Sequence, residues 1–365
     1  MKSDKLRRID SLDIVRGTIV LLSVLLFSIP IKINWLNVHA DWYGFTVIDI
    51  ILPAFITIFG TSMAIAYRKG INKKRFLSRT LKLLLYGLIF NIIVSWSFDL
   101  DTLRVTGVLQ LFAILGIATV IITRIIKKPL FLFIISVLIF ILHGLILINS
   151  SEYCGNNLPS PSCNPSKIID TYIFGENHIY VQGKRGFDPE GIPSMFGALG
   201  NVLLGYVVGL VILRKKKIEM QLIMMILIAL IMLLITVQFI PIGKRLWTPS
   251  FGFLTVGITI TLILINYYIF DRKSADMKFV NPIKNLLIAF GRNSFLIYFG
   301  KYLLDSLLRN ITINVNNSEQ SLRNIIKNFL DAFSPIEGLL YAVVIFSFWL
   351  IIAIVCHKKR WYFKV

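Results

Sequence analysis

Apolar segments of about twenty residues recur along the whole 365-residue chain, and they constrain its fold more than any other feature. A bilayer has a hydrocarbon core about 30 Å thick, and about twenty residues of α-helix cross it. Of all residues, 56% are hydrophobic and only 16% are charged, and the mean hydropathy is +0.75. The sequence therefore predicts an all-α fold, a polytopic membrane helix bundle.

We expect about ten transmembrane helices within one integral-membrane domain, residues 1–365, because the apolar segments follow one another without an internal repeat or soluble appendage. The first apolar segment lacks a small-residue cleavage site, which favours a retained helix over a signal peptide. The expected spans are 14–31, 45–67, 80–98, 105–123, 129–148, 191–213, 219–239, 249–270, 284–304 and 335–356.

The net charge of +20 is explained by membrane orientation rather than by nucleic acid. With the N-terminus inside, 27 of the 39 Lys and Arg residues fall at inner segments, as the positive-inside rule describes. We therefore expect both termini to be cytoplasmic and anionic lipid to be the surface partner. The protein is expected to be an integral, multi-pass protein, of the plasma membrane if the chain is prokaryotic, and a homodimer is compatible with this.

Three segments between spans are longer than a turn, and we expect all three to be extracytoplasmic loops: 32–44, 149–190 and 305–334. Long loops on one face often carry function. The last reads as a surface loop with a short amphipathic helix. Cys154 and Cys163 share the second loop, where an oxidising compartment would permit a disulfide and a reducing one would leave two thiols.

An ionisable side chain in the hydrocarbon core costs about 2.5–3.5 kcal/mol or more unless it is paired or wetted. His39 precedes the second span, where it could serve as a general base or transient acyl carrier, or belong to an interfacial aromatic belt beside Trp42. Asp49 lies inside that span, four residues before Pro53, which is expected to kink the helix. Asp49 either faces a polar cavity or bonds to a neighbouring helix.

Other charged residues also allow two interpretations. Asp13 and Arg16 are three residues apart, so they either pair or belong to the helix entry. Asp188, followed by proline, is a well-formed helix start, although Asp188 and Glu190 could together bind an amine or sugar hydroxyls. Arg292 interrupts the ninth span and could meet cytoplasmic phosphates or simply snorkel. No phosphate loop, nucleophile elbow or metal-binding triad is found, so no metal is expected.

Seven stretches in order resemble the transmembrane acetyltransferase family of heparan-α-glucosaminide N-acetyltransferase, including its bacterial members that lack an N-terminal lumenal region. They are RRIDSLDIVRG, HADWYGFTVIDIILPAFITIFGTSM, LRVTGVLQ, IIDTYIFGENHIY with FDPEG, KRLWTPSF, GRNSFLIYFG and KKRWYFKV. The resemblance covers nearly the whole chain, and the pattern around His39 is its most specific part.

The resemblance implies that His39 is the catalytic histidine, that acetyl-CoA is the co-substrate bound from the cytoplasmic side, and that the acceptor is the amine of a glucosamine-type sugar or glycan on the opposite face. Asp49 or Asp41 could fix the histidine tautomer. We predict that Arg16, Gln110, Asn293 and Arg292 bind the cofactor. Predicted substrate-binding residues are Asp41, Trp42, Asp188 and Glu190.

The chain departs from the family pattern at three positions, where Phe27, Leu111 and Lys301 replace Asn, Arg and His. These changes leave room for a different acceptor, such as a surface amino sugar. Two alternative functions stay open: a secondary transporter of a small polar solute, because broken helices and intramembrane charges are common in transporters, and a membrane O-acyltransferase acting on a surface glycan.

Overall fold

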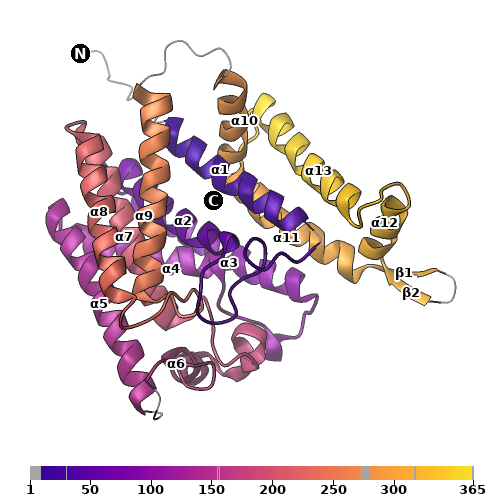
Figure 1. Ribbon diagram of the computed structural model, residues 1–365, viewed down its shortest axis with the longest axis horizontal. Helices are drawn as coiled ribbons and strands as arrows, with labels where there is room; N and C mark the ends of the chain where they lie inside the picture. The colour runs from indigo at the N-terminus through magenta and orange to yellow at the C-terminus, as the bar shows by residue number, and fades with distance from the viewer. Residues whose placement is uncertain are drawn as a thin grey trace.

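The computed structural model describes residues 10–29, 31–153, 155, 157–272, 280–315 and 318–363, and these are mostly helical (Figure 1). The long helices are α1 (Asp10–Ser28), α2 (Ile51–Ala66), α3 (Lys73–Ser95), α4 (Val108–Ile125), α5 (Pro129–Tyr153), α7 (Ile192–Arg214), α8 (Ile218–Thr236), α9 (Pro249–Asn266), α10 (Val280–Arg292), α11 (Ser294–Asn310) and α13 (Leu339–Lys358). The 3₁₀ turn η1 (Val47–Ile50) leads directly into α2, and the π-helical turn η5 (Tyr267–Arg272) extends α9.

In the described part of the chain, nine helices are long and apolar enough to cross a membrane. They match nine of the ten expected segments, which confirms an integral membrane protein built of helices. The segment expected at 284–304 is instead divided into α10 and α11. Asn293 leaves helical geometry between them, with φ −107° and ψ 21°, so neither half is long enough to cross as a single straight helix.

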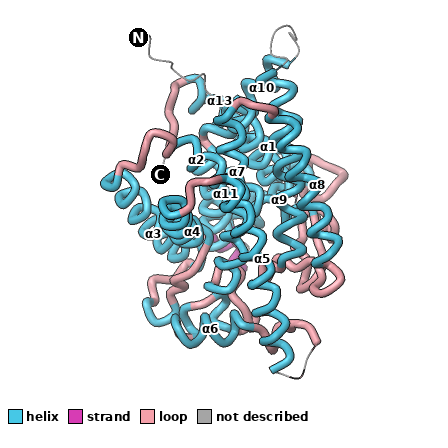
Figure 2. Tube along the Cα trace, turned by 90° about the vertical axis from the view of Figure 1, so that its left-hand side faces the viewer, coloured by secondary structure: helices cyan, strands magenta, loops and turns pink. Residues whose placement is uncertain are grey.

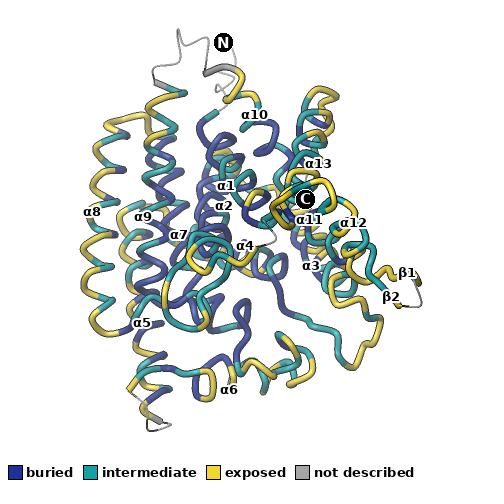
Figure 3. The backbone as a smooth tube through the Cα atoms, turned by 45° about the vertical axis from the view of Figure 1, so that its right-hand side comes forward, coloured by how far each residue is buried: buried dark blue, intermediate teal, exposed yellow. Residues whose placement is uncertain are grey.

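The centre of the bundle is formed by α2 and α7, which Figure 3 shows as the darkest, most buried segments. In the apolar stretches of these two helices, 72% and 78% of the residues are buried. Glycines let the two backbones touch: a Cβ on Gly60 would lie 2.0 Å from the carbonyl oxygen of Val202, and one on Gly205 would lie 1.9 Å from that of Thr57. Small residues at a crossing of membrane helices permit this close van der Waals packing.

Outer helices carry the surface that faces lipid. In the apolar stretches of α3, α8 and α13, only 17%, 22% and 22% of the residues are buried. Their exposed residues include Leu81, Leu227 and Ile351. Because these side chains are apolar and cover contiguous helix faces, water would be a poor solvent for them. Their exposure therefore fits a bilayer.

The beginning of α2 differs from the expected helix. Pro53 does not kink an established helix, because it lies in the first turn of α2, where a missing N–H breaks no helical hydrogen bond. Asp49 lies just before it, in η1, where Thr46 and Asp49 form a capping box. The carboxylate is thus at the end of the helix rather than deep within the span.

Shorter elements cover one end of the bundle and its side. These are α6 (Pro165–Phe174), the 3₁₀ turns η2 (Leu100–Thr102), η3 (Glu176–His178) and η4 (Tyr180–Gly183), the hairpin β1 (Thr312–Val315) and β2 (Ser318–Ser321), and α12 (Leu322–Asp331). The antiparallel hairpin pairs Thr312 with Ser321, an addition to the expected all-α fold. The strongly amphipathic α12 is the short helix expected in 305–334. Cys163 is disulfide-bonded, and Cys154 lies outside the described residues.

Candidate active site

Four loops that are far apart in the sequence are joined by hydrogen bonds, and Figure 2 shows loop segments around α6 at one end of the bundle. They precede α2, α4, α7 and α9. The backbone N–H of Gly44 donates to Ile242 at 2.7 Å, and that of Val105 donates to His178 at 3.0 Å. Trp42 Nε1 and the Tyr43 hydroxyl both donate to the carbonyl of Pro159 at 2.8 Å. We call this loop assembly the loop end of the bundle.

His39, Asp49 and Lys244 form a hydrogen-bonded cluster at the loop end. His39 Nδ1 is 2.6 Å from Asp49 Oδ1, so we assign the proton to Nδ1, which donates to the carboxylate. Lys244 Nζ lies 3.3 Å from the same oxygen, 2.9 Å from Nδ1 and 3.4 Å from Nε2 of His39. An ammonium only donates and Nδ1 carries the proton, so we assign Asp49 Oδ1 as the acceptor of Lys244.

Asp49 is oriented by groups that hold both of its oxygens. Its Oδ2 accepts from the Thr46 hydroxyl at 2.8 Å, the Thr46 N–H at 3.1 Å and the Ala40 N–H at 3.4 Å. The residue has no exposed surface, whereas the His39 side chain is 37% exposed. Histidine is therefore the accessible member of this pair, and the carboxylate fixes its tautomer. Asp41 is exposed, and among the described contacts Asp49 alone makes this hydrogen bond to His39.

The loop before α9, which carries Lys244, is anchored to two helices of the bundle. His143 Nε2 donates to the carbonyl of Leu246 at 2.8 Å, and Trp247 Nε1 donates to Asn201 Oδ1 at 2.9 Å. Both partners belong to membrane-spanning helices, α5 and α7. The lysine is thereby presented to His39 by the rigid core of the bundle.

Burial and the neighbouring Lys244 lower the pKa of His39, although Asp49 acts in the opposite direction. Burial also lowers the pKa of Lys244, against the influence of Asp49 and Glu190. His39 is consequently neutral at physiological pH, and its Nε2 lone pair can accept a proton or attack a carbonyl carbon.

A second charged cluster lies beside the first. Arg104 donates to Asp188 Oδ1 at 2.5 Å and to Glu190 Oε2 at 2.6 Å. Although burial alone would lower the pKa of Arg104, the two carboxylates raise it. Asp188 also accepts from Thr106, from the Tyr180 N–H at 2.8 Å and from the Glu190 N–H at 3.0 Å.

These bonds divide the predicted substrate-binding residues. Both oxygens of Asp188 are occupied within the protein, which gives it an organising role. Glu190 Oε1 has no hydrogen bond among the described contacts, and Glu190 acts electrostatically on Lys244. Trp42 anchors its loop through Pro159 and packs edge-on against Phe187 at 5.2 Å. Glu190 is thus the carboxylate available to a ligand near His39.

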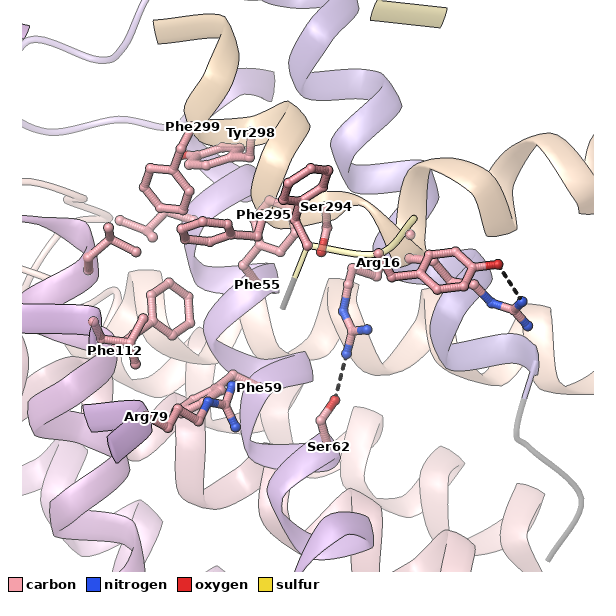
Figure 4. Close-up of a pocket in the computed structure, with 17 residues that line it drawn as sticks. Arg16, Phe55, Phe59, Ser62, Arg79, Phe112, Ser294, Phe295, Tyr298 and Phe299 are labelled. Carbon is pink, nitrogen blue, oxygen red and sulfur yellow. Dashed lines mark hydrogen bonds between the residues drawn. The ribbon is translucent and has the colours of Figure 1, made fainter. Parts of the chain in front are cut away.

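A cavity of about 380 Å³ lies within the bundle, and Figure 4 shows the side chains that line it. Arg16, Arg79 and Arg292 line it, and Arg16 donates to Ser62 at 2.8 Å. Aromatic rings form most of the remaining wall: Phe55, Phe59, Phe112, Phe295, Tyr298 and Phe299. Cationic groups and an apolar channel in one cavity suit a ligand with phosphates and an uncharged extension.

Two of the four predicted cofactor residues, Arg16 and Arg292, line this cavity. Gln110 and Asn293 lie immediately beside lining residues in the chain. Both are buried, and the Gln110 amide and Asn293 Oδ1 have no hydrogen-bond partner in the described part of the protein. Arg79 was not predicted because its basic segment was attributed to membrane orientation.

The cavity and the His39 cluster approach each other along one helix. Leu52 lines the cavity and follows Asp49 by three residues in the continuous helical segment Val47–Ala66. Three residues correspond to about 5 Å along a helix. His39 is not among the lining residues, so the Leu52 region separates the two sites.

A family model described as "Heparan-alpha-glucosaminide N-acetyltransferase, catalytic" matches residues 8–236, more than half of the chain. The chain belongs to this family. The matched range contains His39, Asp49, Arg104 and Glu190, whereas Lys244 lies beyond it.

Two curated relatives carry the name heparan-alpha-glucosaminide N-acetyltransferase. The human protein is 23% identical over 427 aligned residues, which cover 98% of this chain and 60% of the human one. The mouse protein is 24% identical over 397 residues, which cover 91% and 57%. The chain therefore spans about three fifths of the length of these family relatives.

Replacing Lys244 by Met should raise the pKa of His39, because it removes a cation beside the ring while Asp49 remains. Diethyl pyrocarbonate modifies neutral imidazole, so the pH dependence of its reaction with His39, followed by mass spectrometry, reports this pKa. We expect the midpoint of reactivity to move to higher pH in Lys244→Met.

Lys184→Met is the matched control, because Lys184 is an exposed lysine of the same loop end; its midpoint should equal that of the wild type. An unchanged or lower midpoint in Lys244→Met would contradict the assigned contact between the lysine and the ring.

Proposed function

We propose that this chain is a transmembrane acetyltransferase, which moves the acetyl group of acetyl-CoA to the amine of a glucosamine-type sugar on the other side of the membrane. One observation carries the proposal. An accessible histidine bonded to a buried carboxylate lies at the loop end of the bundle, and this carboxylate is about one helical turn from an arginine-lined cavity.

The proposed orientation places the loop end outside and the arginines inside. The short connections 67–72, 126–128 and 215–217 are at the arginine end, and they carry a basic excess as cytoplasmic loops do. Arg292 contacts Asp13 near the beginning of α1 at 3.4 Å and Tyr362 after α13 at 3.4 Å. These contacts support an arrangement with both described chain ends on one side, in which α10 and α11 together would supply a tenth crossing.

The donor would enter the cavity with its phosphates at Arg16, Arg79 and Arg292 and its pantetheine arm along the rings. Its thioester would then lie near Leu52, and the buried Gln110 amide, whose Nε2 donor has no partner among the described residues, is the candidate to bind its oxygen. The aromatic wall of the cavity would also limit the access of water to the thioester.

The acceptor amine would bind at the loop end, where Glu190 can hold its ammonium form. The ammonium first releases one proton to solvent, because only the neutral amine has a lone pair. The amine nitrogen then attacks the acetyl carbonyl carbon, a C–N bond forms and the C–S bond breaks. His39 Nε2 takes the proton that the nitrogen loses, and the leaving thiolate is then protonated to the free thiol. Asp49 stabilises the resulting imidazolium.

The same residues also permit transfer in two steps, in which Nε2 first accepts the acetyl group and the amine then attacks the acetylimidazole. Incubation with radiolabelled acetyl-CoA in the absence of sugar separates the two orders, because label remains on the protein only in the second.

Replacing His39 by Ala should reduce acetyl transfer at least about a hundredfold, the usual contribution of a general base. The measurement uses purified protein in detergent, radiolabelled acetyl-CoA and a panel of amino sugars. Binding of desulfo-CoA, a non-reactive donor analogue, should be unchanged, which shows that the variant is folded. Undiminished transfer by His39→Ala would refute the assigned role.

The orientation predicts which engineered cysteines an impermeant maleimide reaches from outside the cell. Asn37→Cys and Lys184→Cys should be labelled, because both lie at the loop end. Lys216→Cys, in the connection between α7 and α8, should be labelled only after the membrane is permeabilised. Labelling of position 216 in intact cells would overturn the proposed orientation.

A further inference from the structure

The segment after α13 turns back onto the bundle. Arg360 has a positive φ of 57°, and the N–H of Trp361 donates to the carbonyl of Cys356 at 2.8 Å. A left-handed residue followed by a bond that spans five residues is the helix-ending Schellman pattern. Arginine pays a steric penalty in this conformation, which glycine would avoid. The turn directs Tyr362 and Phe363 toward the cavity.

Tyr362 and Phe363 are lining residues of the arginine-lined cavity. The guanidinium of Arg292 lies 5.7 Å from the centre of the Tyr362 ring, and its NH1 donates to the Tyr362 hydroxyl at 3.4 Å. Phe363 is 52% exposed, so these two rings belong to the open side of the cavity. The other rings belong to helices α2, α4 and α11 inside the bundle.

Another part of the cavity wall, beside Phe59, carries an unsatisfied cationic donor. Arg79 Nε is buried and has no hydrogen-bond partner among the described residues, and the Arg79 guanidinium lies over the Phe59 ring at 5.4 Å. A buried guanidinium N–H without an acceptor is costly, and an anionic oxygen would satisfy it. Arginines next to exposed aromatic faces provide what a nucleotide requires, namely partners for its phosphates and a surface for its base.

We propose that Tyr362 and Phe363 of the C-terminal segment form part of the donor site, where they stack against the adenine of coenzyme A while Arg16, Arg79 and Arg292 bind its phosphates. The inference rests on the proposed function and adds to it a recognition element for the nucleotide half of the donor. The pantetheine half would then contact only the rings of the helices.

Binding of desulfo-CoA and of pantetheine to purified full-length protein, measured by isothermal titration calorimetry, tests this assignment. The Tyr362→Ala variant should bind desulfo-CoA roughly tenfold more weakly than the wild type, because it lacks one stacking partner for the adenine. Pantetheine has no adenine, so its affinity should not change. Tyr362→Phe keeps the ring and should remain close to the wild type.

Trp361→Ala is the matched control, because Trp361 is an aromatic residue of the same segment, is 55% exposed and is not a lining residue of the cavity. It should bind both ligands normally. Equal desulfo-CoA affinity in Tyr362→Ala and wild type would overturn the inference, as would an equal loss for both ligands, which would indicate a merely structural segment.

The outcomes also separate this inference from the proposed function. Wild-type protein that binds desulfo-CoA with no effect of Tyr362→Ala contradicts only the role of the segment. A tenfold effect without any acetyl transfer would support the nucleotide site and contradict the acetyltransferase. A phospholipid headgroup is the alternative phosphate ligand, and phosphatidylglycerol tests it. If Tyr362→Ala weakened the binding of this lipid but not the binding of desulfo-CoA, the assignment to a nucleotide would be overturned.

Discussion

The arrangement of the loop end depends on the need to satisfy Asp49, a carboxylate with no exposed surface at the edge of a membrane domain. An unpaired buried charge would be strongly destabilising. Asp49 avoids this by accepting hydrogen bonds from Thr46, Ala40 and His39 and by approaching Lys244. These contacts join the loop before α2 to the loop before α9, and they give the histidine one defined tautomer.

The same requirement explains why stability and chemistry are difficult to separate at this site. A neutral imidazole is useful because its lone pair is free, and here the neutral form is favoured by burial and by the nearby lysine. The bundle contributes rigidity, since His143 and Asn201 fix the lysine-bearing loop from α5 and α7. At the other end, arginines and rings form a cavity. The α2 helix links the two, with Asp49 at its beginning and Leu52 in the first turn.

Segment length was enough to predict most of the membrane helices, because apolar runs of bilayer length have few alternatives to a helix. The pairing of His39 with Asp49 could also be predicted from the sequence, because the two are ten residues apart. The contact with Lys244 could not be predicted, because Lys244 is 205 residues away from His39 and its position depends on tertiary packing. The expected kink at Pro53 was replaced by a change of helix type, because Pro53 lies in the first α-helical turn directly after the 3₁₀ turn η1. Spacing suggested that Asp188 begins a helix, but this was wrong, because α7 begins at Ile192 with Gly191 as its N-cap. The hydrogen bond from Arg104 to Asp188 could be found only from the fold.

The central claim is that a donor bound from one side of the membrane acetylates an acceptor on the other. Proteoliposomes containing glucosamine inside, with radiolabelled acetyl-CoA added only outside, test it directly because neither the donor nor the acetylated sugar crosses an intact bilayer. The account predicts labelled N-acetylglucosamine trapped within the vesicles, and its absence from vesicles carrying His39→Ala. Label that appears only on sugar supplied together with acetyl-CoA on the outside would contradict transfer across the membrane.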